Sequence, residues 1–114
     1  MYHAAGGSGG GVFQAAHDAG ALAIGADSDQ YLTAPADVKK VILTSMVKHL
    51  DDAVKDYVHA LARKSPYPRV KTFDLASGGV GYSKSNPLVL PYLARTDELH
   101  RQIVAGEIRV PGEL

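Results

Sequence analysis

The 114-residue sequence contains no cysteine, so disulfide bonds, thiolate chemistry and a cysteine-linked lipid anchor are excluded for this chain. Neither charge is in excess, because 12 Lys and Arg residues balance 12 Asp and Glu residues. Zero net charge argues against a basic nucleic-acid footprint and against a polybasic membrane patch. No apolar run is long enough to cross a bilayer, and residues 1–20 lack the pattern of a signal peptide.

The length allows one small domain. Residues 1–5, "MYHAA", have the pattern of the second half of a buried strand and run directly into a glycine-rich segment. Natural domains more often begin with a frayed, polar lead-in. We therefore expect residues 1–114 to be a single partial domain, the C-terminal part of a longer protein.

The first 26 residues predict a βαβ unit. We expect a strand near residues 2–5, a helix near residues 11–19 and a strand near residues 21–26. Gly20 suits the left-handed position just beyond the helix end. The continuous apolar run "ALAIGA" is typical of a strand covered on both faces in a parallel sheet.

The remainder of the chain predicts further α/β structure. The β-branched run at residues 41–44 predicts a strand, and a three- and four-residue apolar period predicts a long helix over residues 45–64. Residues 70–75 and 79–83 have the pattern of a strand pair around a Ser-Gly-Gly turn. A last helix is expected near residues 91–105, because a proline opens it and Gly106 suits its end.

The glycine-rich segment "AAGGSGGGV" follows the first strand and opens a helix, which is where backbone N–H groups can approach a ligand. The dinucleotide fingerprint is incomplete, because Gly7 and Gly9 would require glycine at position 12, which is valine. The phosphate loop of nucleotide hydrolases is absent as well. A tight structural turn and a ligand-contacting turn both remain open for this segment.

Asp27 ends the strand at residues 21–26 and is the leading candidate for a ligand contact. Carboxylates at the carboxyl edge of parallel strands commonly accept hydrogen bonds from ligand hydroxyls. Calcium is not expected, because the acidic ladder stops at Gln30. Lys48 is expected in the first turn of the long helix, where a cation opposes the helix dipole. Lys48 is therefore either an ordinary solvated lysine or one that donates to a ligand.

No catalytic signature accompanies these residues. The five histidines form no metal-binding pair, and no nucleophile elbow surrounds Ser8. We therefore predict no enzyme activity, no metal and no cofactor. The alternative is a small nucleotide-binding α/β enzyme that uses the glycine-rich segment and Asp27.

Four motifs, taken in order, resemble one family. These are "YHAAGGSGGGVFQAAHDAGALAIGADSDQY", "VILTSMVKHLDDAV", "GGVGYSKSNPLV" and "IVAGEIRVP". Together they resemble the C-terminal part of the basic membrane protein family. These proteins are nucleoside-binding lipoproteins of bacterial ABC importers, similar to the purine nucleoside receptor.

The resemblance implies the C-terminal part of a type I periplasmic-binding-protein fold, an α/β fold with a parallel sheet and flanking helices. It implies that Asp27 and Lys48 hold the ribose hydroxyls of a nucleoside, which we expect to be a purine nucleoside, and that Gly6 and Gly7 lie beside the same cleft. It further implies membrane subunits of an ABC transporter as partners and a location in the cell envelope, at the plasma membrane or in the periplasm. The lipidated cysteine and first lobe of the family are absent from this sequence, so we expect half of a nucleoside site. We also expect low stability or self-association, since strand edges would lack partners.

Overall fold

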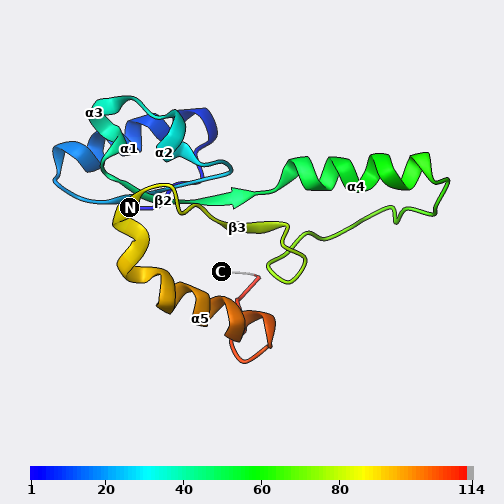
Figure 1. Cartoon of the computed structure of the whole chain (residues 1–114). Helices are drawn as coiled ribbons and strands as arrows, with labels where there is room; N and C mark the ends of the chain where they lie inside the picture. The colour runs from blue at the N-terminus through cyan, green and yellow to red at the C-terminus, as the bar shows by residue number, and fades with distance from the viewer. Residues whose placement is uncertain (113–114) are drawn as a thin grey trace.

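The computed structural model describes residues 1–112, and Figure 1 shows a small sheet with helices on both sides and one helix projecting from it. The helices are η1 (Gly6–Ser8), α1 (Gly9–Asp18), α2 (Gln30–Thr33), α3 (Ala36–Lys39), α4 (Leu50–Ala62), η2 (Pro87–Tyr92) and α5 (Leu93–Val104). The strands are β1 (Ala23–Gly25), β2 (Ile42–Lys48) and β3 (Val80–Tyr82). The expected α/β fold is therefore confirmed.

The sheet has the order β1-β2-β3, and β2 pairs in two different ways along its length. Its first half runs parallel to β1, with Ile24 opposite Thr44 and Gly25 opposite Ser45. Its second half runs antiparallel to β3, with Met46 opposite Tyr82. The expected parallel sheet is thus mixed, because β3 adds an antiparallel strand.

The hydrophobic core lies between the parallel strands and helices α1 to α3. It consists of Phe13, Ala16, Ala23, Val38, Val41 and Ile42. Two buried polar groups tie later residues to β2 from the other side. Asn86 Nδ2 donates to Ile42 O at 2.7 Å, and Ser83 Oγ accepts from Ser45 N at 3.0 Å. Satisfied buried polar groups of this kind fix strand register as well as adding stability.

Two helices, and the glycines that follow them, lie where the sequence predicted. The helices expected at 11–19 and 91–105 are α1 and α5, each displaced by about two residues, as is usual for helix boundaries. Gly20 and Gly106 have φ values of 62° and 77°, so both occupy the left-handed position that ends a helix.

The helix predicted over residues 45–64 is wrong at its start. Residues 45–48 continue β2, and α4 begins at Leu50. Ser45 is fully buried and exchanges backbone and side-chain hydrogen bonds with Ser83, while Met46, Val47 and Lys48 pair with β3. The apolar residues at 46 and 47 satisfied a helical period, but pairing with a distant strand decided their structure.

Two other strand predictions differ from the structure. Residues 70–75 form no strand, because β3 pairs with β2 and residues 74–79 form a turn closed by Gly79 N donating to Asp74 O at 2.9 Å. Residues 2–5 supply a single parallel bridge, between Tyr2 and Ile24. The βαβ arrangement is present, but its first strand is reduced to that bridge.

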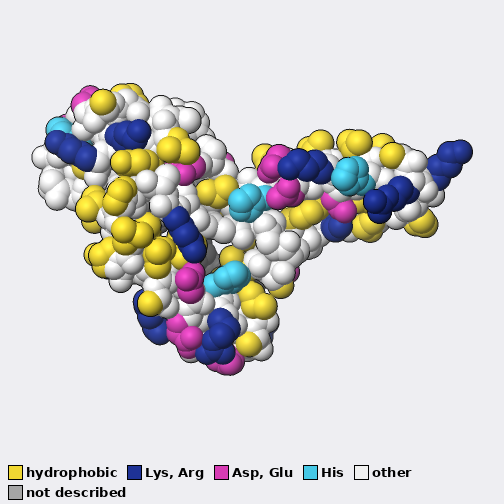
Figure 2. Space-filling view, viewed as in Figure 1, with side chains coloured by type: hydrophobic (Ala, Val, Ile, Leu, Met, Phe, Trp, Pro, Cys, Tyr) yellow, Lys and Arg dark blue, Asp and Glu magenta, His cyan; other side chains and the backbone are white. Residues whose placement is uncertain are grey.

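Helix α4, called the arm below, leaves the end of β2 and projects away from the rest of the molecule (Figure 1). The chain measures 52 × 32 × 29 Å, and its radius of gyration is 16.5 Å. A compact domain of this length has a radius of gyration of about 13 Å. No residue of the arm is buried, and hydrophobic side chains extend along it (Figure 2). Across the described part of the chain, no helix combines the length and apolarity needed to span a membrane.

Candidate functional site

Asp27 and Lys48 lie side by side where β1 and β2 end. Asp27 follows β1 after one buried alanine, and Lys48 is the last residue of β2. Lys48 N donates to Asp27 O at 3.0 Å, which extends the strand pairing by one step. The ammonium nitrogen of Lys48 lies 2.7 Å from Oδ1 of Asp27. Lys48 was expected in a helical first turn; the structure corrects this and places it at a strand end.

The pair lies on an open surface. About half of each side chain is exposed, 51% for Asp27 and 48% for Lys48. Within residues 1–112, Asp27 Oδ2 receives no hydrogen bond, so that oxygen is free to accept from a ligand. The hydrogen bond to Asp27 raises the pKa of Lys48, and the charge of Asp27 adds to the effect. Lys48 therefore remains a cation throughout the neutral range.

The backbone conformation of Asp27 is unusual for a residue other than glycine. Its φ is 71°, in the left-handed region that non-glycine residues rarely adopt. Asp tolerates this region better than most residues because its short polar side chain can hydrogen-bond locally. The conformation turns the chain sharply after β1 and leaves the carboxylate at the exposed strand edge.

A partly buried polar network holds the loop after Asp27. Gln30 Oε1 accepts from Ala26 N at 2.8 Å, and Ser45 Oγ accepts from Gln30 N at 3.1 Å. A Cβ on Gly25 would lie 2.5 Å from Ser45 Oγ and 2.6 Å from Gln30 Oε1, so only glycine fits there. Asp29 Oδ1 accepts from Ser85 Oγ at 2.9 Å. Asp29 and Gln30 thus hold the loop in place.

The glycine turn lies at the same end of the strands as Asp27. Residue 2 pairs in parallel with Ile24, so the residues after position 5 extend in the same direction as those after Gly25. Gly6 and Gly7 begin η1, and no atom stands within 4 Å of a Cβ built on either. The backbone of the turn is therefore accessible to a ligand.

Two residues at this edge were not predicted from the sequence. Tyr2 pairs with Ile24 beside the end of β1, and its charge makes a minor contribution to the raised pKa of Lys48. His3 is buried, with its ring centroid 5.1 Å from that of Phe13, and its Nδ1 accepts from Ala5 N at 3.3 Å. Its Nε2 has no hydrogen-bond partner among the described residues. A Cβ on Gly9 would lie 2.7 Å from that atom, so the ring occupies the space beside the start of α1.

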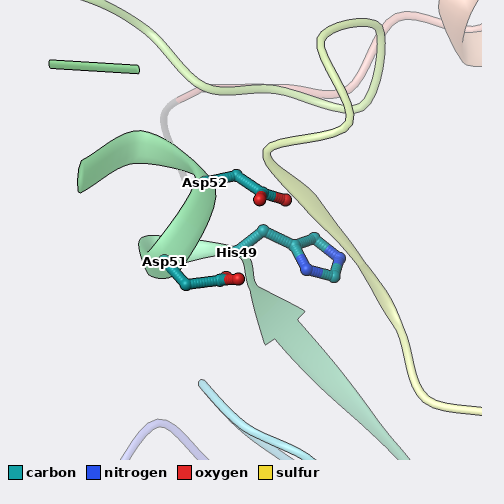
Figure 3. A group of neighbouring side chains, drawn as sticks. All are labelled: His49, Asp51 and Asp52. Atoms are coloured by element: carbon teal, nitrogen blue, oxygen red, sulfur yellow. The ribbon is translucent and has the colours of Figure 1, made fainter. Parts of the chain in front are cut away.

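One group of possible metal ligands stands at the start of the arm. Figure 3 shows His49, Asp51 and Asp52 with their ligand atoms close together, and these atoms lie within 4.8 Å of one another. Lys55 already holds both carboxylates, at 2.9 Å from Asp51 and 3.1 Å from Asp52. This contact lowers the pKa of Asp51 and raises the pKa of Lys55. Acidic residues are ordinary at an exposed helix start, where they complement the dipole.

Comparisons with known proteins cover nearly the whole chain and agree with one another. Residues 1–113 match the Bmp family model, described as "ABC transporter substrate-binding protein PnrA-like". The chain is 32% identical over 125 residues to the "CD4+ T-cell-stimulating antigen" of Listeria monocytogenes serovar 1/2a (strain ATCC BAA-679 / EGD-e). That match covers 97% of this chain and 35% of the relative, so the chain spans about a third of that relative's length.

Solved structures give the same result for the fold. An ABC transporter solute-binding protein from Conexibacter woesei DSM 14684 superposes with a TM-score of 0.69 at 26% identity, over 91% of this chain and 35% of that one. A second, from Aeropyrum pernix K1, gives 0.68 at 21% identity, over 98% and 40%. Both likenesses agree with the α/β fold that the sequence predicted.

Proposed function

The chain belongs to the Bmp family of PnrA-like ABC transporter substrate-binding proteins, and from this membership we propose that it carries the sugar-contacting half of a nucleoside-binding site. The function is solute binding for an ABC importer, with the transporter's membrane subunits as partners and the cell envelope as location. Residues 1–114 act as one partial domain of such a protein. The proposed role is binding, with no catalysis.

The observation that carries this proposal is the Asp27–Lys48 pair. The two groups lie 2.7 Å apart at the ends of neighbouring parallel strands, and both are half exposed. A carboxylate accepts hydrogen bonds and an ammonium donates them, so together they complement the adjacent 2′- and 3′-hydroxyls of a ribose. Parallel strand ends commonly form the floor of a ligand crevice in α/β folds.

The glycine turn supports the same site. Its exposed backbone lies at the strand edge where Asp27 stands, and Gly6 and Gly7 leave room for a ligand to approach. The alternative, a nucleotide-dependent enzyme using this turn and Asp27, is not favoured by the family match. It also lacks the third glycine of the dinucleotide fingerprint, since position 12 is valine.

The test compares nucleosides that differ only in the ribose hydroxyls. Half a site is expected to bind in the millimolar range, about −4 kcal/mol, which an NMR titration of the isotope-labelled protein detects. Inosine should bind and shift the backbone signals of Asp27, Lys48 and Gly7, whereas 2′,3′-dideoxyinosine should not. NAD serves as the probe for the enzyme alternative.

The variant Asp27→Ala should abolish detectable inosine binding, because each charge-assisted hydrogen bond contributes roughly 1.5–3 kcal/mol. Lys48→Ala should weaken binding less, since its ammonium is a mobile point charge. The matched control is Asp37→Ala, which removes an exposed carboxylate from α3 and should leave binding unchanged. Equal binding of inosine and its dideoxy analogue would show that Asp27 and Lys48 do not hold a ribose.

A further inference from the structure

Asp27 lies at the centre of a strained backbone turn. Its φ is 71°, and Ser28 N donates to Ala26 O at 2.9 Å across it. A hydrogen bond that closes three residues around a central φ of about +75° is the pattern of a γ-turn that is rare and strained. One other non-glycine residue of the described chain, Lys64, has a positive φ, and it follows the end of α4, where this conformation is common. Asp27 ends no helix, so its conformation has another cause.

Gln30 holds the turn on both sides. Before the turn, its Oε1 accepts from Ala26 N at 2.8 Å. After the turn, its own N donates to Ser45 Oγ at 3.1 Å. These two bonds fix the chain at residues 26 and 30, so the residues between them have to reverse direction within a short span. A backbone conformation that costs energy by itself persists where neighbouring contacts determine it in this way, and such strain is typical of ligand-binding positions.

Ser45 gives this arrangement a rigid anchor in the sheet. It is fully buried in β2, its N donates to Ser83 Oγ at 3.0 Å, and its O accepts from Ser83 N at 2.9 Å. Gly25, which is opposite Ser45 in the β1–β2 pairing, leaves the space that the Gln30 side chain fills. A Cβ on Gly25 would lie 3.2 Å from Cβ of Gln30. The turn is therefore held from the sheet through Gln30.

We propose that Gln30, anchored on Ser45, is a positioning residue that keeps Asp27 in its strained turn and so sets the carboxylate for ligand binding. This inference rests on the proposed contact between Asp27 and a ribose. Gln30 acts through the backbone of Ala26 and does not need to touch the ligand. Without its hydrogen bond the turn relaxes, and only a fraction of the molecules present the carboxylate beside Lys48. The apparent affinity falls in proportion to that fraction.

Two substitutions separate the hydrogen bond from the shape of the side chain. Gln30→Met keeps an unbranched side chain of similar size but removes the amide oxygen, whereas Gln30→Glu keeps an oxygen that can accept. A positive φ brings the amide and α protons of one residue close together, which gives a strong NOE between them. Asp27 should show this strong NOE in the wild-type chain and in Gln30→Glu, and it should lose it in Gln30→Met.

The same variants are titrated with inosine. Gln30→Met should raise the inosine dissociation constant about tenfold, which is the change expected when about a tenth of the molecules keep the competent turn. Gln30→Glu should bind inosine as the wild-type chain does. The control Thr44→Val removes a hydrogen bond from the same strand as Ser45, the one from Thr44 Oγ1 to Ser83 O at 2.7 Å. It should leave both the Asp27 NOE and inosine binding unchanged.

The outcomes distinguish positioning from general stability. A strong Asp27 NOE in Gln30→Met, or unchanged inosine binding after that NOE is lost, would overturn the proposal. An equal loss of inosine binding in Thr44→Val would also overturn it, because the loss would then follow from destabilisation of the strand. If the wild-type chain binds no inosine, the proposed function fails, and the NOE alone then decides whether Gln30 holds the turn.

Discussion

The core region and the arm have similar amphipathic sequences but different environments. Helix α1 buries Phe13 and Ala16 against the parallel strands. The arm has an equally regular apolar period, yet none of its residues is buried. Periodicity therefore predicts that a helix has an apolar face, but it does not determine whether anything packs on that face. The substitutions below test this difference, from the largest expected effect to the smallest.

Ile42→Ala in the core should lower the free energy of unfolding by about 2–5 kcal/mol, because Ile42 is completely buried and truncation leaves a cavity. Leu61→Ala in the arm should change it by less than about 0.5 kcal/mol, since that side chain is largely exposed and both residues favour helix. Urea denaturation measures both.

Both substitutions are measured at several protein concentrations, so that any contribution of association to the stability of the arm is detected. A loss at Leu61 comparable to that at Ile42 would show that the arm packs within the monomer.

Gly9→Ala should destabilise the chain by about 1–3 kcal/mol, because the new methyl group would overlap the buried ring of His3. Gly10→Ala, one residue later in the same helix, should stabilise it by about 0.5–1 kcal/mol, since open space surrounds that position and Ala favours helix. Thermal unfolding distinguishes the opposite signs. Adding His3→Ala should reduce the cost of Gly9→Ala; an unchanged cost would contradict this explanation.

Asn86→Ala should cost about 1–3 kcal/mol, because it leaves the buried carbonyl of Ile42 without its donor and removes the cap of η2. The comparison is Lys71→Met, which removes the exposed ion pair between Lys71 and Asp56 of the arm. That change should cost less than about 1 kcal/mol, as is usual for exposed pairs. Equal losses in urea denaturation would contradict this contrast.

The smallest effect concerns acid pH at the arm. The hydrogen bond from Lys71 lowers the pKa of Asp56 below its ordinary value of 3.8, and Tyr67 OH also donates to that carboxylate, at 3.1 Å. The depressed pKa means that this contact is fully present above pH 3.8 and is lost as pH falls through the lower folded-state pKa. NMR titration should show residues 67–71 separating from the arm in that window. An Asp56 carboxyl that titrates at or above 3.8 would contradict it.

The sequence predicted elements with strong local signals. Helices α1 and α5 were located to within about two residues, because glycine and proline mark their ends and their apolar faces are regular. The boundary between β2 and α4 was missed. Met46 and Val47 fit both a helical and a strand pattern, and the pairing partner that decides between them is β3, more than thirty residues away.

The candidate site was predicted in part for a similar reason. Asp27 follows an apolar run, which marks a strand end from local sequence alone, and its neighbour Lys48 was identified but assigned to a helix. Their mutual distance of 2.7 Å depends on the β1–β2 register. The burial of His3 against Gly9 had no sequence signal, because it requires the packing of two segments around Phe13.

The hydrogen bonds that complete β2 also set the order in which the chain can fold during synthesis. Ser45 and Ile42 depend on Ser83 and Asn86, which lie 38 and 44 positions later. A ribosome therefore makes the arm before it makes the residues that fix the strand preceding it. Until Asn86 emerges, a nascent chain exposes the apolar side of the arm beside an unfinished sheet, and we expect the chain to be most prone to aggregation in that interval.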